Sequence, residues 1–194
     1  MATANTKRNK DAHNNDLYTT SNESLQLLWD NAPHILKRAT TVVDNSFGLG
    51  DITRFFKEKG KQVYGMDLVN YGDDYASHLD GVTYGNFLEM EPSKFDMNHV
   101  MVFNPPFTLT YEFINQSLLW CDNLFIFNRL NTLESIKRSN KFKSKEWPLK
   151  KVYVFGKRVS CPKGEAYEQS PNATAYCWLE LEAGYEGEPT ICWI

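Results

Sequence analysis

Short apolar runs recur along the middle of the chain, each separated from the next by roughly twenty residues. They cover residues 41–44, 62–67, 82–86 and 99–103. This spacing is typical of strands that are joined by helical crossovers, as in βαβ units. It predicts an α/β fold with a largely parallel sheet.

Further apolar runs complete this pattern on the C-terminal side. They predict more strands, and apolar positions three or four residues apart predict the helices. The additional strands are expected at 123–127, 151–155 and 174–181 with a short terminal run at 190–194, and the helices at 21–36, 52–58, 109–120 and part of 133–142. We therefore expect a three-layer, Rossmann-like sandwich with a mainly parallel sheet of seven principal strands.

The composition is that of one compact domain. The 194 residues are 42% hydrophobic and 23% charged, which is ordinary for a globular protein. Residues 1–15 have almost nothing to bury, so we expect a disordered leader before a single domain at 16–194. There is no apolar run of membrane-span or signal-peptide type, and the four cysteines lack metal-like spacing. These features predict a cytoplasmic protein with free thiols, no metal and no membrane partner.

A strongly basic segment stands out against an acidic remainder. Residues 129–163 contain eleven Lys and Arg against two acidic residues, a balance of +9, whereas the whole chain has a net charge of −3. Aromatic residues are interleaved with these charges. A basic patch on an acidic body is expected of a protein that grips a polyanion through phosphate contacts. The alternative interpretation is a solvated, lysine-rich helical face.

Polar residues stand at the carboxyl ends of four successive predicted strands, namely Asp44, Asp67, Asn86 and Asn104. In an open α/β sheet, ligands bind beyond these ends. Random placement would seldom put a polar residue at each successive tip. The coincidence therefore predicts a binding site at this edge of the sheet.

The tetrapeptide from Asn104 to Phe107 combines an amide, two prolines and an aromatic ring. Pro105 and Pro106 end the strand and stiffen the turn that follows. The Asn104 side-chain oxygen and the Pro105 carbonyl are then free as acceptors, and the Phe107 ring offers a stacking face. The motif is suited to holding a planar amine, and a structural Pro-Pro turn with a core Phe explains the tetrapeptide alone equally well.

The loop after the first predicted strand points to a nucleoside ligand. Gly48 and Gly50 let the backbone pass close to a ligand. The G-x-G-x-x-G fingerprint is incomplete because Thr53 occupies its third glycine position, and no phosphate-binding Lys follows, which disfavours NAD or ATP. Asp67 is positioned to accept hydrogen bonds from the two hydroxyls of a ribose. Loop and acid together predict a nucleoside without a pyrophosphate.

With these residues the chain resembles the class I S-adenosylmethionine-dependent methyltransferases, and within them the adenine-N6 DNA methyltransferases of bacteria and their phages. The resemblance runs from about residue 16 to the C-terminus. Asn104 to Phe107 match the catalytic Asp/Asn-Pro-Pro-Tyr/Phe signature, and Asp44, Gly48 and Gly50 match the cofactor loop Asp-Pro-x-x-Gly-x-Gly. The family also pairs its long late strand, here 174–181, antiparallel.

The resemblance implies methyl transfer from S-adenosyl-L-methionine to the N6 amine of adenine in double-stranded DNA. The base would leave the helix, Asn104 and Pro105 would hold its amine, and Phe107 would stack on it. The implied catalytic residues are Asn104, Pro105, Pro106 and Phe107; the implied cofactor-binding residues are Tyr18, Thr20, Asp44, Ser46, Phe47, Gly48, Gly50, Asp67, Leu68, Asn86, Phe87 and Asn104; the nucleic-acid-binding candidates are Arg129, Lys137, Arg138, Lys157, Arg158 and Lys163.

Two positions depart from the family pattern. Asn45 and Ser21 stand where the family has proline, so we expect a looser backbone and weaker cofactor binding. The region that could recognise DNA sequence is limited to about 129–147 and 156–173. Specificity is therefore expected to be short or lax.

Two other classes of function stay open. The same signature serves enzymes that methylate amines in RNA or glutamine side chains in proteins, and the basic segment favours nucleic acid without separating DNA from RNA. The second open class is a catalytically idle protein, which keeps the fold and binds nucleic acid or a host factor. The resemblance places the enzyme in a bacterial cell, encoded by a phage and connected with restriction and modification. Its target sequence and oligomeric state do not follow from the sequence.

Overall fold

The structure is a computed structural model that describes residues 17–92, 98–161 and 174–194. The predicted leader, the first residue of the predicted domain and the candidate Lys163 lie outside the described residues. Within the described ranges, no helix combines the length and the apolar character that crossing a membrane requires.

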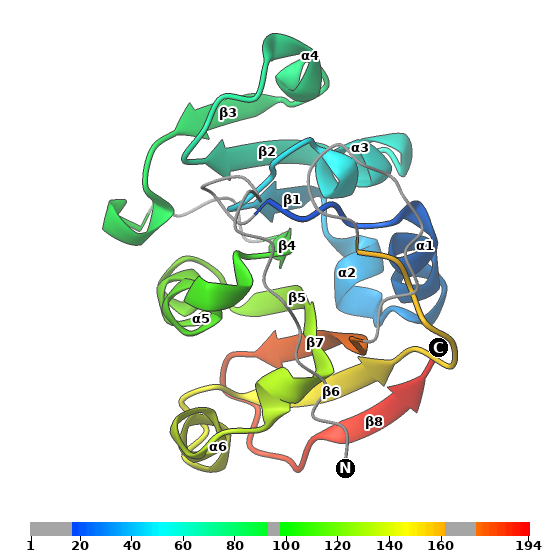
Figure 1. The fold of residues 1–194 in the computed structure, drawn as a ribbon, viewed down its shortest axis with the longest axis vertical. Helices are drawn as coiled ribbons and strands as arrows, with labels where there is room; N and C mark the ends of the chain where they lie inside the picture. Colours follow the sequence, from blue (N-terminus) through cyan, green and yellow to red (C-terminus); the bar gives the residue numbers. More distant parts are fainter. Residues whose placement is uncertain (1–16, 93–97, 162–173) are drawn as a thin grey trace, which may run out of the picture.

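Eight strands form one sheet in the order β3-β2-β1-β4-β5-β7-β6-β8 (Figure 1). Strand β7 runs antiparallel to β5 and β6, and the other pairs are parallel. The predicted mixed sheet with a late antiparallel strand is confirmed. The terminal run adds an eighth strand to the seven expected, because it pairs with β6. The strands are β1 (Thr41–Asp44), β2 (Gln62–Asp67), β3 (Gly81–Tyr84), β4 (His99–Phe103), β5 (Asn123–Arg129), β6 (Leu149–Val154), β7 (Tyr176–Glu182) and β8 (Thr190–Trp193).

Helices cover both faces of the sheet and confirm the three-layer architecture. Val42 packs in a buried cluster with residues of α1 (Asn22–Asn31), α2 (His34–Arg38) and α3 (Asp51–Glu58). Its neighbour Val43 packs on the opposite face with residues of α5 (Thr110–Trp120), near α6 (Ile136–Lys143). Figure 1 shows these two groups of helices on opposite sides of the strands, with the short α4 (Asp73–Ala76) beside the edge strand β3. Because both faces are covered, the central strands β1, β4 and β5 are buried almost continuously rather than at alternate residues, whereas the edge strands β3 and β8 are largely exposed.

One predicted helix is divided in the structure, and another is located within the range expected for it. The helix expected at 21–36 is two helices, because Pro33 has no N–H and its ring pushes the preceding Ala32 into an extended conformation. The helix expected within 133–142 begins at Ile136, where the Ser135 hydroxyl caps it by accepting from the Arg138 N–H at 3.1 Å. A 3-10 turn at Leu130–Leu133 precedes it.

The order in which the chain adds strands to the sheet changes direction between the parallel neighbours β1 and β4. From β1 the chain proceeds outward to β2 and β3, and from β4 it proceeds to β5 on the other side. In open α/β sheets a crevice forms at this switch point, beyond the carboxyl ends of the strands. Asp44 ends β1 and Asn104 follows β4, so two of the predicted site residues flank the switch point.

The cysteines are free thiols, as predicted. Cys121, Cys161 and Cys177 are buried and Cys192 is half-buried. Among the described residues, no group of three His, Cys, Asp or Glu side chains is arranged to hold a metal ion.

Candidate active site

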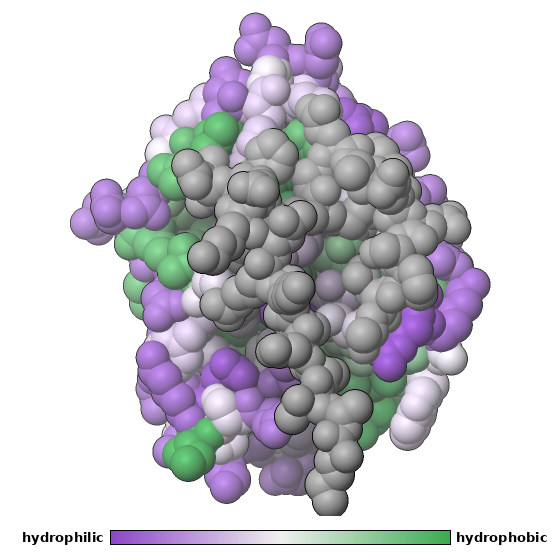
Figure 2. Space-filling model, viewed as in Figure 1, coloured by the Kyte–Doolittle hydropathy of each residue, from purple (hydrophilic) through white to green (hydrophobic). Residues whose placement is uncertain are grey.

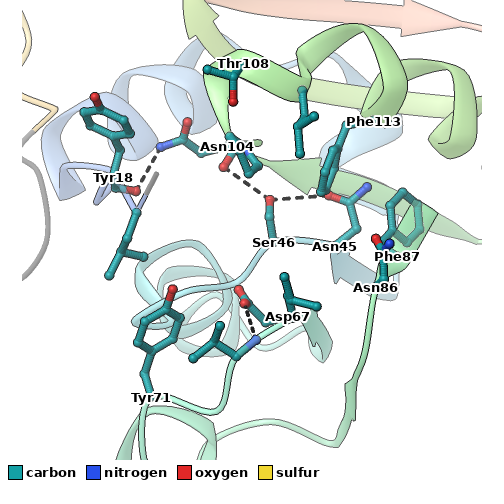
Figure 3. Close-up of a pocket in the computed structure, with 15 residues that line it drawn as sticks. Tyr18, Asn45, Ser46, Asp67, Tyr71, Asn86, Phe87, Asn104, Thr108 and Phe113 are labelled. Atoms are coloured by element: carbon teal, nitrogen blue, oxygen red, sulfur yellow. Dashed lines mark hydrogen bonds between the residues drawn. The ribbon is translucent and has the colours of Figure 1, made fainter. Parts of the chain in front are cut away.

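A cavity of about 220 Å³ opens at the switch point (Figure 3). Tyr18 and Asn104 stand at one end, Asn86 and Phe87 at the other, and Asp67 faces the space between them. The structure thus brings three of the four predicted strand tips to one cavity. The other lining residues are Leu17, Asn45, Ser46, Leu68, Val69, Tyr71, Pro106, Thr108, Leu109 and Phe113.

Asn104 is held in one orientation by the N-terminal segment. Its amide nitrogen donates to the Thr20 hydroxyl at 3.0 Å and to the Tyr18 carbonyl at 3.2 Å. Because that carbonyl can only accept, the amide oxygen must point the other way. This oxygen is buried and has no hydrogen-bond partner among the described residues. A buried acceptor without a donor is costly, so this oxygen is a candidate to accept an N–H from a ligand.

The loop between β1 and α3 depends on its two glycines. Gly48 and Gly50 have φ values of +51° and +80°, which side chains rarely adopt. A Cβ on Gly48 would stand 2.8 Å from the Leu17 side chain, and one on Gly50 would stand 2.8 Å from the Tyr75 carbonyl oxygen. The Gly48 N–H donates to the Asp67 carboxylate at 2.8 Å, which joins the loop to the tip of β2.

Three partly or fully buried carboxyl groups organise this edge of the sheet. Burial raises the pKa of Asp44 well above its ordinary value, and the nearby Asp67 adds to this effect while a hydrogen bond from the Ser46 N–H opposes it. Burial also raises the pKa of Asp51, which accepts from the Thr20 N–H, and of Asp67, which accepts from the Gly48 and Val69 N–H groups. A nearby cation would stabilise the ionised form of each.

The predicted cofactor residues divide between two spaces. A narrow cleft of about 10 Å³ lies behind the main cavity and shares Tyr18, Ser46 and Asn104 with it. Thr20, Asp44, Phe47 and Gly48 line this cleft instead of the main cavity, and Gly50 lines neither. Their part in the geometry is to shape the loop, whereas Asp67, Leu68, Asn86 and Phe87 face the main cavity.

The two departures from the family pattern are both anchored by side-chain hydrogen bonds. The buried Asn45 amide donates to the Ser117 hydroxyl of α5 at 2.7 Å. The Ser21 hydroxyl caps α1 by accepting from the Ser24 N–H at 3.3 Å. Proline could make neither bond. The contacts therefore argue against a loosened backbone, and weaker cofactor binding stays a prediction.

Asn86 and Phe87 form the far end of the cavity. The Asn86 side chain accepts from the Leu88 N–H at 3.2 Å and caps the 3-10 turn Phe87–Glu89. The buried Phe87 ring packs against Phe113 with ring centroids 5.5 Å apart. This end therefore combines a flat apolar surface with a polar backbone turn.

A chain of buried hydrogen bonds ties the Asn-Pro-Pro-Phe turn to the end of β5. The Thr132 hydroxyl donates to the Asn128 side-chain oxygen at 2.8 Å, and the Asn128 amide donates to the Thr110 hydroxyl at 2.8 Å. Thr110 in turn donates to the Phe107 carbonyl at 3.2 Å. In each of these hydrogen bonds the donor and the acceptor are fixed. The series therefore holds the turn in one position relative to the sheet.

The Phe107 ring lies outside the main cavity and among three neighbours. The centroids of the Tyr18 and Tyr176 rings are 4.8 Å and 5.9 Å from its own. The Arg129 guanidinium carbon lies 4.4 Å from its centroid. Cys161 is buried nearby, and burial raises the pKa of its thiol to about 12, so it is neutral and unsuited to nucleophilic attack.

The predicted nucleic-acid-binding residues have different surroundings. Arg138 donates to the carbonyls of Thr132, Asn131 and Glu134, so its guanidinium holds the turn before α6. Lys157 pairs with Glu23 at 2.5 Å, and the Lys137 ammonium lies 3.4 Å from the Tyr111 ring centroid. Arg158 is exposed and lines a second cavity of about 360 Å³ with Lys157 and Tyr176. The surface over α6 is mostly hydrophilic (Figure 2).

Several lining residues escaped the sequence prediction. Asn45 directly follows a strand tip, so extending the tip rule by one residue would have found it. Thr108, Leu109 and Phe113 come from the turn and helix that follow the tetrapeptide. Extending the prediction by one residue past the tetrapeptide would have found Thr108 only. Tyr71 carries no signal of its own, because it enters the cavity through the shape of the loop after β2.

No protein-family model and no curated protein matches the sequence. Solved structures match the fold. A candidate RNA methyltransferase from Pyrococcus horikoshii aligns with a TM-score of 0.59 at 14% identity over 85% of each chain. The 23S rRNA methyltransferase ErmE has a TM-score of 0.56 at 14% identity, over 89% of this chain and 72% of that one.

A third match is magnesium protoporphyrin IX methyltransferase from Synechocystis, crystallised with bound S-adenosylmethionine. It has a TM-score of 0.52 at 12% identity, over 82% of this chain and 76% of that one. The chain therefore has the fold of class I S-adenosylmethionine-dependent methyltransferases. The matched proteins act on unlike substrates, so the fold leaves the substrate open.

Proposed function

We propose that the protein transfers a methyl group from S-adenosyl-L-methionine to the N6 amine of adenine in DNA. The observation that carries this proposal is the side-chain oxygen of Asn104, a residue that lines the cavity; this oxygen is buried and has no donor among the described residues. An exocyclic amine supplies that donor. The adjacent Pro105 carbonyl is the second acceptor that the Asn-Pro-Pro-Phe signature implies.

The cavity suits this cofactor by its chemistry. The Asp67 carboxylate accepts two backbone N–H bonds and keeps lone pairs for ribose hydroxyls. Asn86 and Phe87 offer an apolar face and polar groups for an adenine ring, and Tyr18 and Ser46 stand where the methionine part would end. When bound, the cofactor supplies a methyl group on a positively charged sulfur, a charge that the buried acids favour.

The chain's own residues then position the acceptor amine. Asn104 and Pro105 would accept both amine hydrogens, turn the nitrogen lone pair toward the methyl group and stabilise the positive charge that grows on nitrogen. The links from Thr132 through Asn128 and Thr110 keep the turn in place. Phe107 would stack on the extruded base, and Arg129, Lys137 and Arg158 would contact the strand.

RNA is the second candidate substrate, because two of the matched structures are the Pyrococcus candidate RNA methyltransferase and the 23S rRNA methyltransferase ErmE. A basic surface binds the phosphates of either nucleic acid. Transfer to protein glutamine uses the same signature but leaves the basic residues without a role. We also propose, from the resemblance, a phage-encoded enzyme of bacterial cells that takes part in restriction and modification.

The test is incubation of the protein with labelled cofactor and with unmethylated DNA, RNA and protein extract, followed by nucleoside and amino-acid analysis. Label in N6-methyladenine from DNA is the expected result. Label in RNA alone moves the function to the second candidate, and label only in protein overturns the proposal. A separate measurement recognises a catalytically idle protein. A cofactor that binds the native state must raise the melting temperature, so no shift at saturating S-adenosyl-L-methionine would favour the idle protein.

A further inference from the structure

The ring that should stack on the target base is already covered. The guanidinium carbon of Arg129 lies 4.4 Å from the centroid of the Phe107 ring. Tyr18 and Tyr176 approach the same ring at tilted angles of 41° and 36°. The face of Phe107 under Arg129 is therefore closed to a base until the guanidinium moves.

Arg129 is the most weakly held of the three. Its Nε is buried and has no hydrogen-bond partner among the described residues, and no acidic side chain in the described ranges forms an ion pair with it. A guanidinium has five N–H donors to satisfy. The contact with the ring contributes modestly at a half-buried site, and leaving it would let the Nε reach a hydrogen-bond acceptor.

The two tyrosines are tied to the frame of the molecule. The Tyr18 carbonyl accepts from the Asn104 amide, so moving Tyr18 would disturb Asn104 itself. Tyr176 begins β7, stacks on Phe127 at 5.2 Å with an interplanar angle of 14°, and pairs in register with Arg129 of β5. The Tyr176 ring is buried and stacked in the core, so it has less room to turn away than the half-buried Arg129 side chain.

We propose that Arg129 is a placeholder for the target base. In the free protein its planar guanidinium covers Phe107. When a polynucleotide binds, the side chain moves to a phosphate of the strand and the base takes its place on the ring. This inference rests on the proposed function, because it requires a planar base as the acceptor.

A path for the strand lies next to Arg129. The cavity of about 360 Å³ is lined by Leu130, which follows Arg129 in the chain, by Tyr176, and by the basic pair Lys157 and Arg158. A phosphate in this cavity would meet the exposed Arg158, and Lys157 if its ion pair with Glu23 opens, beside the residue that follows Arg129 in the chain. The placeholder would thus couple phosphate binding to the opening of the base site.

The test compares two ligands on wild type and Arg129→Ala, with S-adenosylhomocysteine present. Deoxyadenosine has a base but no phosphate, and a single-stranded oligothymidylate with one central adenine has both. We expect Arg129→Ala to bind deoxyadenosine roughly twofold to thirtyfold more tightly, because no cation must be displaced. The same variant should bind the oligonucleotide about tenfold more weakly, with a salt dependence reduced by about one unit. Tighter binding of deoxyadenosine together with weaker binding of the oligonucleotide identifies a placeholder.

Two further variants separate this role from a structural one. In Phe107→Leu, adding Arg129→Ala should no longer improve deoxyadenosine binding. Lys151→Ala removes a similar cation–ring contact, with Tyr153 at 5.4 Å, and should leave deoxyadenosine binding unchanged. If Arg129→Ala weakens both ligands while wild type still methylates DNA, Arg129 is a wall of the pocket and only the placeholder is overturned. If neither protein binds either ligand, the placeholder falls together with the proposed acceptor.

Discussion

The cofactor side of the sheet and the basic side differ in how well the sequence predicts a site. Residues chosen by their position at strand ends come together, whereas residues chosen by their charge do not. At the ends of β2, β3 and β4, polar residues chosen only because they follow strands come together within one cavity. In the basic segment, residues chosen by their charge are dispersed among internal contacts. The end of a parallel strand has a fixed place in the fold, whereas a long charged side chain binds whichever partner lies nearest.

The basic segment meets acids that lie outside it in the sequence. Lys150 pairs with Glu182 at 2.5 Å and with the buried Glu180 at 3.5 Å, which also accepts from the Tyr153 hydroxyl. Lys157 pairs with Glu23. The balance of +9 therefore overstates the charge that a polyanion would meet, because these acids were counted elsewhere.

The largest effect is expected from Asn104→Ala on the cofactor side. Removing the acceptor aimed at the amine should slow methyl transfer by roughly a hundredfold or more. Single-turnover transfer to DNA measures this loss. Thr20→Val is the matched control, because it removes the anchor of Asn104 and leaves the acceptor oxygen. Near-normal transfer by Asn104→Ala with cofactor binding retained would contradict the assignment.

Asp67→Ala should weaken cofactor binding by about tenfold to a hundredfold, as expected for a lost hydrogen bond to a charged group. Calorimetric titration with S-adenosylhomocysteine measures the change. Asp67→Asn keeps one acceptor oxygen and should lose less. Equal affinity in wild type and both variants would remove Asp67 from the cofactor site.

Asn128→Ala tests the links between β5 and the Asn-Pro-Pro-Phe turn. We expect the transfer rate to fall by about tenfold, because a small misplacement of the turn is amplified in the rate. Cofactor affinity should stay unchanged, since Asn128 lies outside that cavity. A parallel loss of cofactor affinity would show a general structural defect instead.

A smaller effect distinguishes exposed cations from paired ones on the basic side. Arg158→Ala should lower the salt dependence of DNA binding by about one unit, because the side chain is exposed and forms no ion pair among the described residues. Lys150→Ala should change it little, since its partners are Glu180 and Glu182. Equal changes in the two variants would mean that total charge alone governs binding.

The smallest effect concerns the stability of the unliganded protein. Burial raises the pKa of Asp44, so the folded protein keeps this proton at pH values where the unfolded chain has lost it. The resulting stabilisation is complete below the ordinary pKa of about 3.9 and is lost as pH rises through the raised value. Asp44→Asn should therefore raise the melting temperature near neutral pH by a few degrees, on a scale of about 2–4 °C per kcal/mol. An unchanged or lower melting temperature would contradict this account.

The sequence by itself determined the order of strands and helices, the late antiparallel strand as the resemblance implied, and the tips that hold Asp67, Asn86 and Asn104. Backbone pattern and chain direction suffice for these, because parallel strands bring their carboxyl ends to one edge. Pro33 could also have been used to divide the first helix, since its effect is local.

Only the tertiary structure decided that the Asn104 amide nitrogen is held by the Tyr18 carbonyl, that Asn45 has a partner in Ser117, and that Arg129 covers Phe107. The two residues of each such contact lie from 22 to 86 positions apart. Hydrogen bonds and ring contacts form only within a few ångströms, and packing alone sets which distant side chains come that close.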